Sequence, residues 1–233
     1  SVITAQEFKE VSQRTGRLVD TPAEAREMEN VPARLRHMDQ LGVDIQVLYP
    51  SIFIEQTTDK PEVDVAICNG FNRWMAHLWK QSENRLPWVC ALPLLSMQDA
   101  LDMLPFCKEN GAVAVQMRPI EGEMLLPNPY FYSLYEKMSS LSMPLAIHVA
   151  NGNPYVAEIT GQRNFAAGFW KFRLPVVGSF HAIVYSGLAD MFPKLRFAFV
   201  EASAQWVPYL LRDLKRRLPP EGRPWPQDPM QHW

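Results

Sequence analysis

Three side chains with catalytic or ligand-binding chemistry directly follow short, β-rich runs of this sequence. His148 ends the run PLAIH, and the residues after it, ending in Asn-Gly-Asn-Pro, predict a loop. Glu201 follows the run at 194–200, and Arg118 follows the run at 112–117. An imidazole can bind a metal ion or move a proton, a carboxylate can act as general base or metal ligand, and a guanidinium can bind a carboxylate through two parallel hydrogen bonds.

Each of these residues also has a purely structural explanation. A histidine is tolerated in a protein core once it is hydrogen-bonded, so His148 alone is weak evidence for a site. Glu201 precedes a predicted helix near Trp206, where a carboxylate is either solvated or stabilises the first turn. For Arg118, a surface ion pair explains the residue as well as substrate binding does.

The elements that position these residues alternate between helix and strand. Apolar residues recur at helical spacing between short β-rich runs, and Pro32, Gly42, Ser96 and Gly111 mark helix ends. The predicted strands are 43–48, 86–92, 112–117, 144–149 and 194–200, and the predicted helices are 33–41, 64–81, 97–110, 129–142, 176–191 and 206–217. Residues 151–175 predict a long irregular loop, which is often an active-site lid.

Five strands separated by helices, without hairpin signals, predict a parallel sheet with right-handed crossovers. A doubly wound sheet and a barrel both fit this order. The sequence contains no Gly-x-Gly-x-x-Gly and no Gly-x-x-x-x-Gly-Lys, so nucleotide-binding sheets lose their main support. We therefore expect an α/β fold of the TIM-like (β/α) barrel type, whose chemistry lies at the carboxyl ends of the strands.

Composition narrows the class of protein. The chain has 233 residues, 47% of them hydrophobic, and a formal net charge of -2, which gives no basic excess for nucleic acid. The longest apolar runs are strand-sized and no signal-peptide pattern is present, so a membrane partner is not expected either. Cys68, Cys90 and Cys107 lie in apolar segments without Cys-x-x-Cys spacing, which predicts buried free thiols and a cytoplasmic protein.

The chain divides into one predicted domain and a tail. Residues 1–217 form the barrel domain, and residues 218–233 are too proline-rich for a helix or a central strand, so they predict an extended arm. The arm carries Trp225 and Trp233 with little opportunity to bury them locally. Because exposed aromatic side chains usually meet a partner surface, we expect a homodimer.

Four segments in order resemble the amidohydrolase-2 family, which includes metal-dependent decarboxylases of aromatic acids and of aminocarboxymuconate semialdehyde. They are LRHMDQLGVDIQVLYP at 35–50, NGFNRW at 69–74, PLAIH at 144–148 and SGLADMFPKLR at 186–196. The resemblance implies a TIM-like barrel that holds one divalent metal, with zinc expected and manganese the alternative. It also implies that His148 is a metal ligand, and catalytic zinc uses imidazole with one coordination position left open.

The sequence departs from the family pattern at three places. The resemblance implies a first strand ending in Asp/Glu/His-x-His and a late strand carrying an aspartate, and this chain shows neither. An incomplete barrel within a longer protein and a short, inactive relative both explain this. At 199–208 the sequence FVEASAQWVP resembles a branch that carries glutamate where many decarboxylases have a catalytic histidine, which puts Glu201 in that position.

These observations predict a metal-dependent enzyme that decarboxylates or hydrolyses a small carboxylated, aromatic or unsaturated substrate. His148 is the predicted metal ligand and Glu201 the catalytic carboxylate, with Arg118, Asn151 and Trp170 as substrate contacts. The alternative is a non-catalytic barrel that acts as a binding or assembly protein, because only one ligand of the usual set can be assigned. Four further residues, namely His37, His77, His181 and His232, lie in predicted helices or the tail and are expected to take no part in catalysis.

Overall fold

A computed structural model describes residues 21–26, 28–150, 153, 155–156, 158 and 169–217. Its central element is a parallel sheet of four strands in the order β1-β2-β5-β6, which run Trp88–Ala91, Ala112–Met117, Leu145–His148 and Phe197–Val200. Each strand except the first is preceded by a helix that starts after the previous strand, as parallel crossovers require. The sheet confirms the predicted α/β class.

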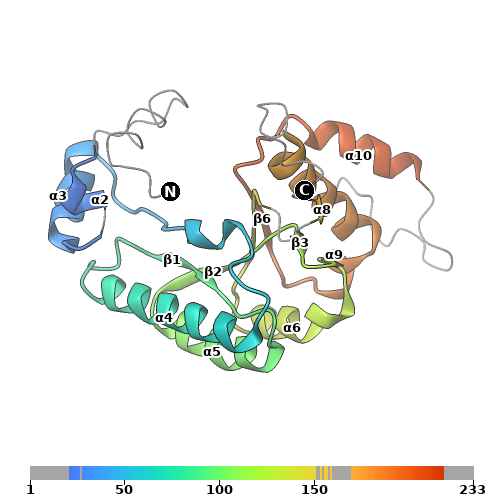
Figure 1. The fold of residues 1–233 in the computed structure, drawn as a ribbon. Helices are drawn as coiled ribbons and strands as arrows, with labels where there is room; N and C mark the ends of the chain where they lie inside the picture. The colour runs from blue at the N-terminus through green and yellow to red at the C-terminus, as the bar shows by residue number, and fades with distance from the viewer. Residues whose placement is uncertain are drawn as a thin grey trace.

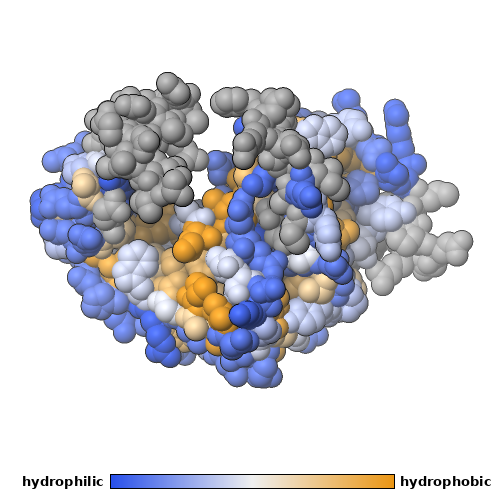
Figure 2. All heavy atoms as spheres, in the orientation of Figure 1, coloured by the Kyte–Doolittle hydropathy of each residue, from blue (hydrophilic) through white to orange (hydrophobic). Residues whose placement is uncertain are grey.

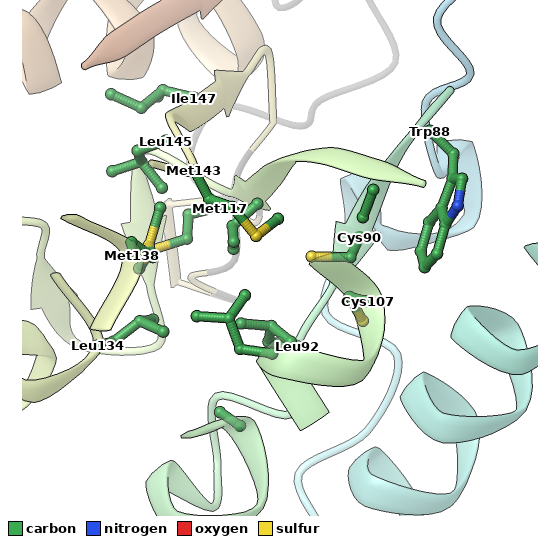
Figure 3. Packing of buried hydrophobic residues seen from close by; sticks show 14 of the residues in the cluster. Trp88, Cys90, Leu92, Cys107, Met117, Leu134, Met138, Met143, Leu145 and Ile147 are labelled. Carbon is green, nitrogen blue, oxygen red and sulfur yellow. The ribbon is translucent and has the colours of Figure 1, made fainter. Parts of the chain in front are cut away.

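Three helices cover one face of the sheet (Figure 1). They are α4 (Pro61–Lys80), α5 (Met97–Glu109) and α6 (Tyr132–Ser140). The main hydrophobic core lies between them and the strands: Cys90, Met117 and Leu145 pack with Leu134 and Met138 (Figure 3). Cys68, Cys90 and Cys107 are buried and free, as predicted, and burial raises the pKa of the Cys68 and Cys90 thiols.

The remaining helices flank this unit. On one side lie α2 (Ala23–Arg26) and α3 (Val31–Leu41), and on the other lie α8 (Leu174–Tyr185), α9 (Leu188–Met191) and α10 (Val207–Arg216) (Figure 1). Asn30 caps α3 by accepting a hydrogen bond from the amide of Ala33, and Gly42 ends it at a φ of 67°. A separate apolar cluster joins Phe180 and Val184 of α8 to Leu210 and Leu214 of α10.

The prediction of a regular strand at 43–48 is wrong. The segment does run parallel to β1: the amide of Leu48 donates to Pro87 and the amide of Val89 donates to Leu48. The next rung of the ladder would need an amide at residue 87 to donate to Gln46, and proline has none. The pairing is therefore reduced to one isolated bridge, Leu48 with Trp88.

Three further expectations need correction. The helix predicted at 176–191 begins earlier and breaks at Gly187, which has a φ of 73° and separates α8 from α9. The helix predicted at 129–142 opens with a 3-10 turn, η2 (Pro129–Phe131). Residues 118–125 contain a small hairpin that was not predicted, β3 (Ile120–Glu121) with β4 (Met124–Leu125), in which Gly122 has a φ of 58°.

Candidate active site

His148 and Glu201 meet at the carboxyl ends of neighbouring strands. His148 is the last residue of β5 and is 7% exposed, and Glu201 directly follows β6. Nε2 of His148 lies 3.7 Å from Oε2 of Glu201, although the Glu201 side chain is 62% exposed. Glu201 has a φ of 62°, a left-handed conformation that costs energy in a residue other than glycine. The chain thus turns sharply here and leaves the carboxylate beside the imidazole.

The two groups suit a cation between them. Nδ1 of His148 lies 3.2 Å from the carbonyl oxygen of Val149, which can accept a hydrogen bond from a proton on Nδ1, and Nε2 faces Glu201. An imidazole nitrogen and a carboxylate oxygen are both ligand types that divalent metals bind. Metal–ligand distances of about 2.0–2.2 Å bring two ligand atoms to a similar separation. No third His, Cys, Asp or Glu completes a cluster among the residues that the structure describes.

The aromatic ring of Tyr49 also lies beside His148, although Tyr49 was not among the residues expected at the site. Its ring centroid lies 5.6 Å from that of His148, with the planes tilted by 48°. Desolvation raises the pKa of Tyr49, so its hydroxyl is neutral at physiological pH. The only sequence signal for it was its place in the family-like segment at 35–50, directly after the residues that run beside β1.

Arg118 follows β2, as expected, but its guanidinium group already binds the carboxylate of Glu121. Nε and Nη2 donate to Oε2 of Glu121 in the hairpin, and Nη1 donates to the carbonyl of Glu55 at 3.0 Å. Burial raises the pKa of Glu121, and the Arg118 charge opposes that shift. The structure therefore shows an ion pair, as the alternative explanation held, although this pair is largely buried rather than on the surface.

Trp170, the expected aromatic contact with the substrate, lies on a short π-helical turn, η3 (Phe169–Arg173), rather than in an irregular loop. Trp170 is 56% exposed, and its neighbour Lys171 forms an ion pair of 2.6 Å with Glu55. Glu55 follows the 3-10 turn η1 (Ser51–Ile54), so this pair joins two segments far apart in the sequence. Asn151 and the arm at 218–233 lie outside the described residues.

Three other histidines lie in helices, as predicted. His37 is in α3 and His77 in α4, while His232 lies outside the described part of the chain. His181 is in α8, with Nε2 at 3.7 Å from Oδ2 of Asp213 and its ring stacked on Tyr185. It packs between α8 and α10, remote in sequence from the strand ends that carry His148 and Glu201.

Comparison with solved structures identifies the same architecture. A 2,6-dihydroxybenzoate decarboxylase from Rhizobium superposes with a TM-score of 0.72 at 21% identity and covers 100% of this chain and 71% of its own. An amidohydrolase from Mycobacterium avium subsp. paratuberculosis K-10 gives 0.74 at 19% identity, covering 87% and 56%. A dihydroxybenzoic acid decarboxylase from Polaromonas sp. JS666, with bound manganese and the inhibitor 2-nitroresorcinol, gives 0.61 at 20% identity, covering 84% and 57%.

At these low identities the superpositions establish the fold alone, which is that of the TIM-barrel amidohydrolases. The chain spans about half to three fifths of the length of several of these proteins, for example 49% of a 5-carboxyvanillate decarboxylase from Sphingomonas paucimobilis. The family model described as Amidohydrolase matches residues 17–232, which is nearly the whole sequence and includes every site residue described above. The chain belongs to this amidohydrolase family.

Proposed function

We propose that this protein is a metal-dependent enzyme that decarboxylates a small carboxylated aromatic compound. The observation that carries the proposal is the pairing of His148 and Glu201 at the carboxyl ends of β5 and β6, where barrel enzymes hold their reacting groups. Family membership and the decarboxylases among the structural neighbours support the reaction class. A non-catalytic binding barrel remains the competing explanation, because the described residues supply two ligand groups and not three.

The residues present fit a divalent ion. In this proposal His148 and Glu201 bind it, with zinc expected and manganese supported by the Polaromonas neighbour. A bound ion supplies Lewis acidity toward a carboxylate oxygen. Glu201, exposed enough to reach a substrate, would bind the ion through Oε2 and hold or move a proton at its other carboxylate oxygen, while the Val149 carbonyl keeps the His148 ring in its orientation.

Aromatic side chains supply the substrate's surroundings. Tyr49 packs against His148 and narrows the space at the end of β5. Trp170 and Phe169 are exposed and meet edge to face, with ring centroids 6.4 Å apart, so they offer two exposed aromatic surfaces set nearly at right angles. We propose Trp170 and Asn151 as substrate contacts. Arg118 reaches a substrate carboxylate only if it releases Glu121, so its direct role is secondary in this proposal.

The test is a substrate screen with paired variants. Full-length protein loaded with zinc or manganese is incubated with carboxylated aromatics, and carbon dioxide release is followed beside hydrolysis of aryl esters and amides. We expect carbon dioxide release, and a loss of turnover by about 10²–10⁴-fold in Glu201→Gln with little change in KM. Glu136→Gln is the matched control, because Glu136 is an exposed carboxylate on α6, away from the strand ends. Hydrolysis without decarboxylation, or neither reaction, contradicts the proposal.

A further inference from the structure

Gln116 is a buried polar residue on the same face of the sheet as His148. It lies in β2, where Val115 and Met117 point into the core beneath the helices (Figure 3 shows Met117 there). Because side chains alternate along a strand, Gln116 points to the opposite face. It is in register with Ala146 of β5, two residues before His148, so it lies one pleat below the imidazole on the neighbouring strand.

The surroundings of Gln116 are small and apolar. Its register partners on either side, Ala91 and Ala146, carry only methyl groups. The residues lower on this face, Val89 and Ala114, form an apolar cluster with Ala146. A polar side chain in this layer costs desolvation energy that neighbouring side chains do not repay.

The carboxamide is only half satisfied. Nε2 donates to the carbonyl of Pro50 at 3.4 Å, which is a long hydrogen bond. Oε1 is buried, and in the described part of the chain it has no hydrogen-bond partner, although the residue is only 5% exposed. Buried acceptors without a donor are rare in native proteins and each calls for an explanation, such as a water molecule or a ligand.

We infer that Gln116 determines substrate specificity by accepting, at Oε1, a hydrogen bond from a hydroxyl or other donor on the bound ligand. The inference rests on the proposed function for the ligand's class, a carboxylated aromatic compound. The donor is a group distinct from the carboxylate, since an ionised carboxylate can only accept. Gln116 is thereby a specificity-determining contact below His148, and an aromatic acid without a donor leaves Oε1 unpaired.

The test compares ligands that differ only in this donor. The probes are the three monohydroxybenzoates, each paired with the fluorobenzoate of the same substitution pattern, because fluorine is close to hydroxyl in size but donates no hydrogen bond. For at least one pair we expect the metal-loaded wild-type protein to bind the hydroxyl compound about tenfold more tightly by calorimetry. Gln116→Met should reduce that ratio to near one, while Gln98→Met, at an exposed helix position, should keep it.

A second readout does not depend on activity. If Oε1 is unpaired in the free protein, Gln116→Met removes a buried acceptor and loses only the long hydrogen bond to Pro50, so the Tm of the unliganded variant should be unchanged or higher by about 2 °C. A Tm lowered by several degrees, or failure to fold, shows a structural role and overturns the inference. A hydroxyl preference that persists in Gln116→Met, or that wild type lacks, overturns it as well. Preferential binding without turnover contradicts the proposed reaction alone and leaves Gln116 as the specificity contact.

Discussion

At the scale of single residues, substitution of His148 is the most direct test of the proposed metal site. It is buried, its Nε2 faces Glu201, and its Nδ1 contacts the Val149 carbonyl. We expect His148→Ala to lower a metal content of about one divalent ion per chain to a small fraction of that value, measured by elemental analysis after dialysis. His77→Ala is the control, because His77 is exposed on α4. Equal metal content in both variants would exclude His148 as a ligand.

The ion pair between Arg118 and Glu121 allows a test of how a buried charge affects stability. Arg118→Met leaves the buried Glu121 carboxylate without its partner, which typically costs about 3–5 kcal/mol of unfolding free energy. Burial raises the pKa of Glu121, so protonation relieves the unpaired charge and the loss should shrink as pH falls. Urea unfolding at pH 7.5 and 5 measures both effects.

The matched control for this variant is Glu55→Gln, which breaks the more exposed pair with Lys171 and should cost less than about 1 kcal/mol. Equal, small losses in the two variants would show that the Arg118 contact with Glu121 contributes little to stability. In that case the guanidinium is free to exchange Glu121 for a substrate carboxylate, as the sequence first suggested.

Residues that follow a strand could be placed from the sequence, while their partners could not. His148 and Glu201 stand at strand ends because an apolar run and its loop are local signals. Tyr49, Glu121 and Gln116 depend on contacts between segments distant in the sequence or on a hairpin with weak turn signals. Such contacts are set by how the sheet curves, which no local pattern encodes.

At the scale of elements, the sequence predicts β2 correctly but wrongly predicts a regular strand at 43–48, beside Pro87. The run predicted at 112–117 matches β2 to the residue, because β2 is paired on both sides by β1 and β5. The run at 43–48 alternates apolar and polar residues as a strand does, but its partner lacks the amide needed for a second rung. Apolar spacing also persists across Gly187, so the sequence predicts one continuous helix where the structure has two.

The contact between α8 and α10 gives a prediction about pH. Desolvation is the main cause that lowers the pKa of His181, the positive charge of Arg217 adds to it, and Asp213 opposes it. A lowered pKa means that the folded state binds this proton less readily than the unfolded chain. Stability should therefore fall as pH drops below the unfolded value of about 6.5.

We expect His181→Leu to lose less unfolding free energy than wild type between pH 7.5 and 5.5, measured by urea titration. His77→Ala should retain the wild-type dependence on pH. If His181→Leu loses as much stability as wild type over this range, the half-buried His181 imidazole does not cause the acid sensitivity.

At the scale of the whole molecule, exposed apolar side chains bear on assembly. Leu41, Ile45, Ile52 and Tyr209 are each more than 60% exposed. Figure 2 shows apolar side chains gathered near the middle of one face, with hydrophilic residues around them. Large exposed apolar patches commonly mark an interface. We propose a homodimer, and light scattering at micromolar concentration should give twice the mass of the chain that is measured, which is 26.7 kDa for these 233 residues. A monomer mass under these conditions contradicts the proposal.

No helix in the part of the chain that the structure describes is long and apolar enough to cross a membrane. The exposed apolar side chains are distinct from the core beneath the helices, where residues such as Trp88 and Tyr135 are fully buried. The exposed side chains near 41–52 lie on and beside the segment that pairs with β1 through a single bridge. That part of the surface therefore combines apolar side chains with backbone groups that a neighbouring strand does not fully satisfy.

The metal connects the site to the stability of the whole chain. His148 ends β5 and Glu201 follows β6, so an ion bound to both links two strand ends that the unfolded chain does not hold together. A ligand that binds only the folded state at about a thousand times its Kd adds about 4 kcal/mol. For a domain of this size, each kcal/mol shifts Tm by about 2–4 °C. Chelation should therefore lower the Tm of the wild-type protein by about 8–16 °C, and adding zinc or manganese should restore it. His148→Ala should begin near the chelated value and respond to neither treatment, whereas a wild-type Tm that is indifferent to chelator would show that these two strand ends hold no metal.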